Sequence, residues 1–250
     1  MSNLFYEILY RPLFNALVFL YQYFSFGDLG VAIILLTILI RLVLFPLFYK
    51  GAKDQAIIQR LAPRIKEIQK NHRDDREKQA RALLDLYREH RVNPLSGFLL
   101  ILAQLPILIA LYRVFLKGFS IESLSALYSF IPKPETLSYH IFNLIDLSQR
   151  DFTIAVFAAV AQYFQGRLAL PKSRPSSQPL TPAETMAKQM VYLGPVLTVV
   201  FLYFLNLPSA IGLYWLTTSA FSVIQQIVIN RTVAKYFEHE GASGGSQKTN

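Results

Sequence analysis

The segment from Gln189 to Asn230 contains no charged residue, and this feature most constrains the fold. A helix needs about 20 apolar residues to cross the hydrocarbon core, so the segment is too long for one membrane span. An Asn-Leu-Pro-Ser run at 206–209 supplies turn-forming residues in its middle. We therefore predict spans at 190–205 and 210–229, joined by a tight outer turn. The first is short, about 24 Å long, and would need locally thinned lipid or shielding by neighbouring helices.

Three further apolar segments, at 29–49, 97–116 and 152–170, match the length of a membrane span. The third is the weakest candidate because several polar residues interrupt it. Hydrophobic residues make up 53% of the chain and charged residues only 16%, whereas soluble proteins carry about 25% charged residues. We therefore predict an all-α polytopic membrane protein whose core, residues 28–231, contains five transmembrane helices.

The charge is concentrated between the first two predicted spans, where residues 50–94 carry twelve basic and seven acidic side chains. Apolar residues recur at helical spacing on both sides of a polar break at 71–75. We predict a hairpin of two amphipathic helices at 51–94, with Pro63 in the first turn of the first helix. The loop 118–151 has few basic residues, so the positive-inside rule places the hairpin in the cytoplasm and this loop outside. Five spans then place the N-terminus outside and the C-terminus in the cytoplasm.

The segments that flank the predicted core differ in composition. Residues 1–27 are rich in aromatic side chains, which favours a helix lying along the outer membrane interface. A signal peptide and an additional span remain open as alternatives for this segment. The Pro- and Ser-rich segment 171–188 is interpreted as a flexible cytoplasmic linker. Residues 232–250 are predicted to form a cytoplasmic tail that is disordered from 241 onward.

Several kinds of chemistry are excluded by missing residue types. The chain has no cysteine, which rules out disulfides, thiolate metal sites and cysteine nucleophiles. Phosphate-binding glycine loops and the GxSxG motif are also missing. We predict no enzyme activity, cofactor, metal, small-molecule substrate or direct nucleic-acid recognition. The histidines are too widely spaced to suggest a metal site: His72, His90, His140 and His239.

Arg41 carries most of the functional information in the sequence. It lies nine residues before Lys50, about 13 Å inside the cytoplasmic end of its span. An arginine at such depth costs about 2.5–3.5 kcal/mol on insertion scales and usually faces a cavity or a partner. None of the five predicted spans contains Asp or Glu. The guanidinium therefore needs water or an anion from another molecule, and a wet groove open to the cytoplasm provides both.

Other spans offer hydrogen-bonding side chains at a similar depth. Thr37 lies one turn from Arg41 on the same helix face. Taken singly, such residues typically join helices to one another. Together with Arg41 they predict one hydrophilic groove. The further candidates for its lining are Gln104, Gln162, Gln165, Tyr214, Trp215, Thr218 and Ser222.

Several short motifs occur in a fixed order between residues 28 and 231. They are TILIRLVLFPL at 37–47, LAPRIKEIQ at 61–69, LYREHRVNP at 86–94, QLPILIALY at 104–112, NLIDLS at 143–148, FLNLPSAIGLYW at 204–215 and IQQ at 224–226. This series resembles the YidC-type membrane protein insertases. The resemblance covers about four-fifths of the chain and rests on separate motifs in the right order.

The resemblance implies a five-helix core around a hydrophilic groove that opens to the cytoplasm and to lipid. It implies that Arg41 is the groove arginine, with Thr37 one turn before it. The substrate-contacting aromatic position of the family falls on Trp215, beside Tyr214, and the glutamine of the third span falls on Gln165. Members of the family reside in the bacterial inner membrane. They insert newly made membrane proteins and help them fold, alone or with the Sec translocon.

Nascent membrane proteins and lipids are accordingly the expected partners, together with the Sec translocon and the ribosome. The sequence departs from the family pattern in three respects. It lacks the large outer domain of some members and the cysteine-containing lipoprotein signal of others. Its C-terminal tail is short and weakly charged, so strong ribosome binding through that tail is not expected.

Two rival functions fit the sequence less well than an insertase does. A proton- or cation-coupled transporter generally needs carboxylates within the membrane, and inverted repeats are typical of transporters. The predicted spans show neither feature. A membrane scaffold with a lipid-binding basic hairpin would explain the charge, but it would leave Arg41 without a role.

Overall fold

The computed structural model describes residues 3–117, 121–134, 138–170 and 182–245. Within these ranges the chain is mostly helical, as predicted. The strands found there are β1 (His140–Ile141) and β2 (Ile145–Asp146), which pair antiparallel with Ile141 opposite Ile145. Hydrogen bonds from the Ser148 hydroxyl and backbone N–H lower the pKa of Asp146 and fix the turn that follows β2.

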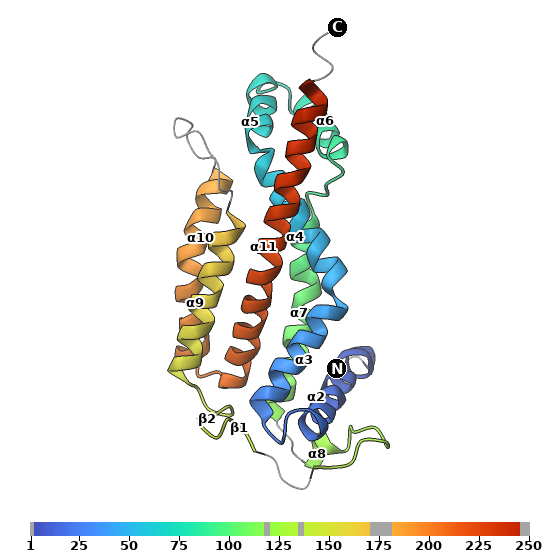
Figure 1. The fold of residues 1–250 in the computed structure, drawn as a ribbon, viewed down its shortest axis with the longest axis vertical. Coiled ribbons are helices and arrows are strands. Elements are labelled where there is room, and N and C mark those ends of the chain that lie inside the picture. Colours follow the sequence, from blue (N-terminus) through green and yellow to red (C-terminus); the bar gives the residue numbers. More distant parts are fainter. Residues whose placement is uncertain (1–2, 118–120, 135–137, 171–181, 246–250) are drawn as a thin grey trace.

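Long helices run side by side along the longest axis of the molecule (Figure 1). They are α3 (Leu29–Val43), α4 (Phe45–Arg60), α7 (Ser96–Lys117), α9 (Phe152–Ala169), α10 (Pro182–Val199) and α11 (Ser209–Gly245). Shorter elements are α1 (Asn3–Phe5), the π-helix η1 (Tyr6–Tyr10), α2 (Arg11–Tyr23), α5 (Ala62–Asn71), α6 (Arg76–Glu89), α8 (Ile121–Leu124) and the π-helix η2 (Val200–Phe204).

The short elements gather at the two ends of the bundle (Figure 1). α5 and α6 lie at the end where α11 terminates, and α8, β1 and β2 lie at the opposite end. α11 extends well beyond the ends of α9 and α10 toward α5 and α6. The bundle therefore has one charged helical end and one end made of loops and short strands.

Two helical segments in the described part of the chain, Ser96–Leu116 and Thr185–Phe204, are long and apolar enough to cross a membrane. A third span is added if the bent pair α3–α4 is counted as one. The predicted spans in α9 and α11 fall below this standard because polar side chains interrupt their apolar faces. The segment Thr185–Phe204 has 20 residues and begins before the predicted span at 190–205, so this helix has the length of a full membrane span.

The predicted boundary between the first span and the hairpin is wrong. α3 ends at Val43, and the chain bends by 68° before α4. Pro46 lies in the first turn of α4, where its missing N–H and its ring prevent the α3 hydrogen-bond ladder from continuing. α4 then runs to Arg60, so the first part of the predicted hairpin segment 51–94 continues a helix from the span. Pro63 lies in the first turn of α5, as predicted.

Two further boundaries differ from the prediction. α10 begins at Pro182, so residues 182–188 of the predicted linker are helical, and residues 171–181 lie outside the described part. α11 continues to Gly245 instead of ending near residue 229. Its extension is stabilised by burial of Val233 in a second core cluster, which also contains Ile57 and Leu61. Residues 246–250 of the predicted disordered tail are not described.

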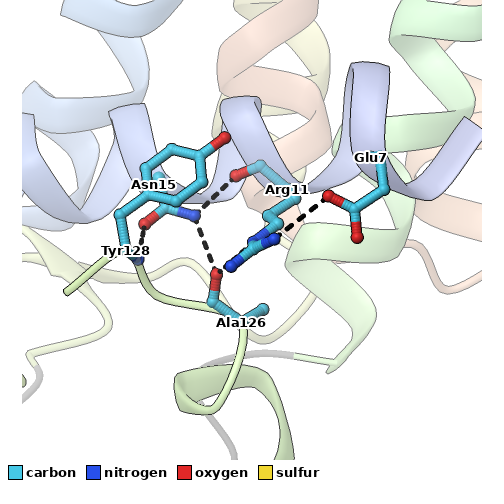
Figure 2. Close-up of polar contacts among 5 residues, drawn as sticks. All are labelled: Glu7, Arg11, Asn15, Ala126 and Tyr128. Atoms are coloured by element: carbon cyan, nitrogen blue, oxygen red, sulfur yellow. Dashed lines mark hydrogen bonds and ion pairs between the residues drawn. The ribbon is translucent and has the colours of Figure 1, made fainter.

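The N-terminal segment is a helix that packs closely on the bundle. In α2, Phe14, Leu17 and Val18 are fully buried and belong to the main core cluster with residues of α3 and α7. Figure 2 shows the polar side of this contact, where Arg11 and Asn15 reach the segment that follows α8. The aromatic composition predicted a helix here, but this extent of burial was not predicted.

We expect Gly30→Ala to destabilise the packing of α3 against β1. A Cβ atom at position 30 would lie 2.4 Å from Cβ of Ile141, so the strand would have to move. Overpacking of this kind costs about 1–3 kcal/mol. Ile141→Gly, which removes the Cβ atom of Ile141, should cost less thermal stability in detergent in the Gly30→Ala background than in the native protein. If Ile141→Gly gives the same loss in both backgrounds, steric contact between the two residues is not the cause.

Candidate functional site

A groove of about 470 Å³ is bordered by residues of α3, α4, α7, α9 and α11. Every site residue predicted from the sequence lines this groove, with the exception of Thr37. The side chains that the structure brings together are Arg41, Gln104, Gln162, Gln165, Tyr214, Trp215, Thr218 and Ser222. They come from four helices that are far apart in the sequence.

Thr37 does not contribute to the groove lining. Its side chain is buried, and its hydroxyl donates to the Ile33 carbonyl oxygen at 2.7 Å within α3. Back-bonding of this kind satisfies a threonine hydroxyl inside a helix. A direct contact between Thr37 and a groove ligand is therefore not supported by its position.

Arg41 lies in the last turn of α3, just before the bend into α4. Only 7% of the residue is exposed, and its guanidinium carbon lies 4.5 Å from the centre of the Phe48 ring. Within the described ranges, no carboxylate forms an ion pair with Arg41. The ring contact contributes a cation–π attraction but supplies no counter-charge. The groove thus holds a largely buried cation without an anionic partner from the described chain.

Two of the predicted glutamines also connect neighbouring helices. Gln104 of α7 donates from Nε2 to the Tyr214 hydroxyl of α11. The Thr198 hydroxyl of α10 donates to Oε1 of Gln162 in α9. The first bond joins α7 to α11 and the second joins α9 to α10, so both glutamines stabilise helix packing and also line the groove.

The contribution of α4 to the groove was not predicted from the sequence. Phe48, Ala52 and Gln55 line it, because the helix continues past the bend. Their spacing of four and three residues is that of one helix face, and this pattern is a signal that could have indicated them. The assignment of residues beyond 50 to a hairpin in water concealed it.

The lining of α11 includes buried polar atoms without a hydrogen-bond partner among the described residues, and one of them belongs to Gln225. Gln225 lines the groove with only 7% of the residue exposed, and its Nε2 atom has no hydrogen-bond partner among the described residues. A buried amide donor without a partner costs about 1–3 kcal/mol. Together with Arg41, this donor suits a groove that accepts anionic or carbonyl oxygen atoms from a ligand.

The angle between α4 and α7 is fixed by a buried carboxylate. Asp54 of α4 accepts a hydrogen bond of 2.6 Å from the Ser96 hydroxyl and a longer one, of 3.4 Å, from the Asn93 backbone N–H. Its exposed fraction is only 4%. Because the Ser96 contact is made at the first residue of α7, it positions the two helices that form one wall of the groove.

Residues 19–236 match the model of the family described as 60Kd inner membrane protein. The chain belongs to this family. Similar proteins named membrane protein insertase YidC occur in several bacteria. That of Citrifermentans bemidjiense is 32% identical over 90% of this chain, and that of Francisella philomiragia is 36% identical over 82% of it. That of Francisella tularensis subsp. novicida is 37% identical over the same share.

These alignments cover 37% of the Citrifermentans protein and 33% of each Francisella protein, so the chain spans about a third of the length of its relatives. The family predicted from the sequence motifs is confirmed. Membership in this 60Kd inner membrane protein family, together with the apolar helices, indicates a multi-pass protein of the bacterial inner membrane.

Proposed function

We propose that this protein is a membrane protein insertase and chaperone, which inserts newly made membrane proteins and helps them to fold. The relatives named as insertases support this function, and so does a groove that gathers polar side chains among apolar helices. The observation that carries the proposal is Arg41, a buried cation in the groove without a carboxylate partner among the described residues. Such a site is suited to a visiting polypeptide that brings its own negative charge.

In this proposal the hydrophilic tail of a client enters the groove from the cytoplasm. The groove shortens the apolar barrier that the tail must cross, and Arg41 attracts acidic residues in it. This attraction is stronger in a low-dielectric site than in water. The apolar segment of the client then slides along α9 and α11 into lipid. Burial of its apolar surface drives the transfer. The membrane potential contributes a further free energy of about 2.3 kcal/mol per charge for each 100 mV.

The proposed topology has five spans. They are the three candidates named above, which include the bent pair α3–α4, together with α9 and α11. Their polar residues line the groove, so these helices can cross the membrane beside their more apolar neighbours. The positive-inside rule places α5 and α6 in the cytoplasm and the N-terminus outside. The basic hairpin would receive clients, and the Sec translocon and the ribosome are the proposed partners. No cofactor or catalytic residue is assigned.

The rival functions account less well for the same residues. A scaffold would leave Arg41 and the groove unused. Among the residues described in the structure, the groove lining includes no Asp or Glu that could carry protons or cations for a coupled transporter. Solute flux in reconstituted vesicles without a client would favour the transporter.

Photo-crosslinking from the groove tests the proposed function. A photoreactive phenylalanine analogue at Trp215 should crosslink to stalled nascent chains of a membrane protein, because the ring lines the groove. The matched control is the same analogue at Phe130, which is 73% exposed in the segment after α8. Equal crosslinking from both positions, or none from position 215, would argue against client passage through the groove.

A further inference from the structure

A second cavity, of about 350 Å³, lies where α4, α9 and α11 meet. It is a neighbour of the groove, because Ala169 at the end of α9 lines both. The function proposed above makes no use of this cavity. Its position in the proposed topology is the cytoplasmic end of the membrane-spanning part, since Arg60 ends α4 and α9 ends at Ala169.

The charged residues in the described lining of this cavity are basic. Arg60 and Arg231 contribute two guanidinium groups, and none of the described lining residues is acidic. Within the described ranges, neither arginine forms an ion pair with a carboxylate. Arg60 donates one hydrogen bond, at 3.5 Å, to the Val233 carbonyl oxygen. Its guanidinium carbon lies 5.4 Å from the centre of the Phe237 ring. These two contacts orient the planar guanidinium group of Arg60, and its other N–H groups remain available as donors.

The remainder of the lining is divided between apolar and polar residues. Leu168, Leu170 and Ile227 provide an apolar wall beside the cations. The Asn230 side chain donates to the Leu168 carbonyl oxygen at 2.9 Å, which ties α11 to the end of α9 and fixes this wall. An apolar wall next to paired guanidinium groups is complementary to an amphiphile with an anionic head.

We propose that this cavity binds the phosphate headgroup of an anionic phospholipid from the cytoplasmic leaflet, with Arg60 and Arg231 as its ligands. Basic pockets between transmembrane helices on the cytoplasmic side are suited to such headgroups, and arginine pairs well with phosphate oxygens. The proposal rests on the orientation proposed above, but it does not require that the protein inserts clients.

The size and setting of the cavity favour lipid over a client helix. A helix with its side chains is about 10–12 Å across, which is too wide for a cavity of this volume. Free phosphate would use the two arginines but not the apolar wall. A phospholipid uses both, because its glycerol and first methylene groups can lie against Leu168 and Ile227.

Lipid retention by the purified full-length protein tests this proposal. Native mass spectrometry would compare phosphatidylglycerol with phosphatidylcholine in detergent, without any client. The Arg60→Gln/Arg231→Gln variant should retain phosphatidylglycerol about thirtyfold less than the native protein. The control variant, Arg73→Gln/Arg76→Gln, removes the same charge from exposed positions of the hairpin and should retain the lipid as the native protein does.

Other outcomes would overturn the proposal. Equal loss of phosphatidylglycerol in both double variants would indicate a general charge effect. Equal retention of the two lipids by the native protein would remove the headgroup preference. Inorganic phosphate that displaces the lipid at similar concentration would identify a plain anion site. Failed client insertion with intact lipid retention would count against the proposed function and leave this site in place.

Discussion

Replacing Arg41 by alanine should reduce insertion of a client with an acidic outer tail by about tenfold to a hundredfold, while the protein itself still accumulates. The estimate follows from the loss of a charge-assisted hydrogen bond in a partly dry groove, about 1.5–3 kcal/mol. The variant should fold, because Arg41 has no ion-pair partner in the described chain that would be left buried and unpaired. Protease protection of the client tail in vesicles measures insertion directly.

A client whose tail has neutral residues in place of the acidic ones provides the internal comparison, since its insertion should depend much less on Arg41. Arg41→Lys should fall between native and alanine, because it keeps the charge but loses the planar fork. Arg113→Ala is the matched control. Arg113 also lies in an apolar helix, α7, but it is outside the groove and its guanidinium group stacks on the Phe5 ring. Normal insertion of the acidic client by the alanine variant would remove the proposed role of Arg41.

The second large effect is expected at Asn15, whose amide joins α2 to the segment after α8 (Figure 2). Its Nδ2 atom donates to the Ala126 carbonyl oxygen at 3.0 Å, and its Oδ1 atom accepts from the Tyr128 backbone N–H at 2.7 Å. Asn15→Leu leaves the Tyr128 N–H without this acceptor, whereas Arg11 still donates to the Ala126 oxygen. We expect a loss of about 1–3 kcal/mol of stability. Thermal unfolding in detergent would measure it.

Gln22→Leu is the matched control for Asn15→Leu. Gln22 also lies on α2 and donates to the loop, to the Pro132 carbonyl oxygen at 2.8 Å, but this bond is exposed. Its Oε1 atom is buried without a partner among the described residues, so leucine removes one unsatisfied group there. The control should change stability little. If both variants lose the same stability, burial of the Asn15 amide is not what holds the segment.

The residues that line the groove could be predicted from the sequence because placing polar side chains in a lipid environment is energetically unfavourable, so their presence in apolar segments indicates a polar site. Arg41 and the glutamines of the apolar segments are expensive in lipid, so their common depth predicted a shared polar site. The sequence could not show that Gln162 accepts a hydrogen bond from Thr198, because that bond depends on how α9 and α10 pack. Thr37 was assigned to the groove from its helix face, but its hydroxyl is satisfied within α3.

The ends of helices were predicted less well than the positions of the apolar segments. Charge density suggested that the first helix stops near Lys50, yet α4 continues to Arg60 because Ile57 and Asp54 are buried by neighbouring elements. α11 likewise continues past the apolar stretch, because Val233 is buried in the second core cluster. These boundaries are set by tertiary packing, which local composition does not report.

The continuous helix α11 connects two parts of the protein that would otherwise be mechanically independent. Near its first turns, Tyr214 and Trp215 line the groove, and farther along Val233 packs with Leu61 and Leu86 at the charged end. Because α11 has no break, a displacement of α5 and α6 by an arriving client would, under the proposed function, also tilt or rotate the wall of the groove. Under the proposed function, client loading at one end and opening of the groove at the other would then be coupled.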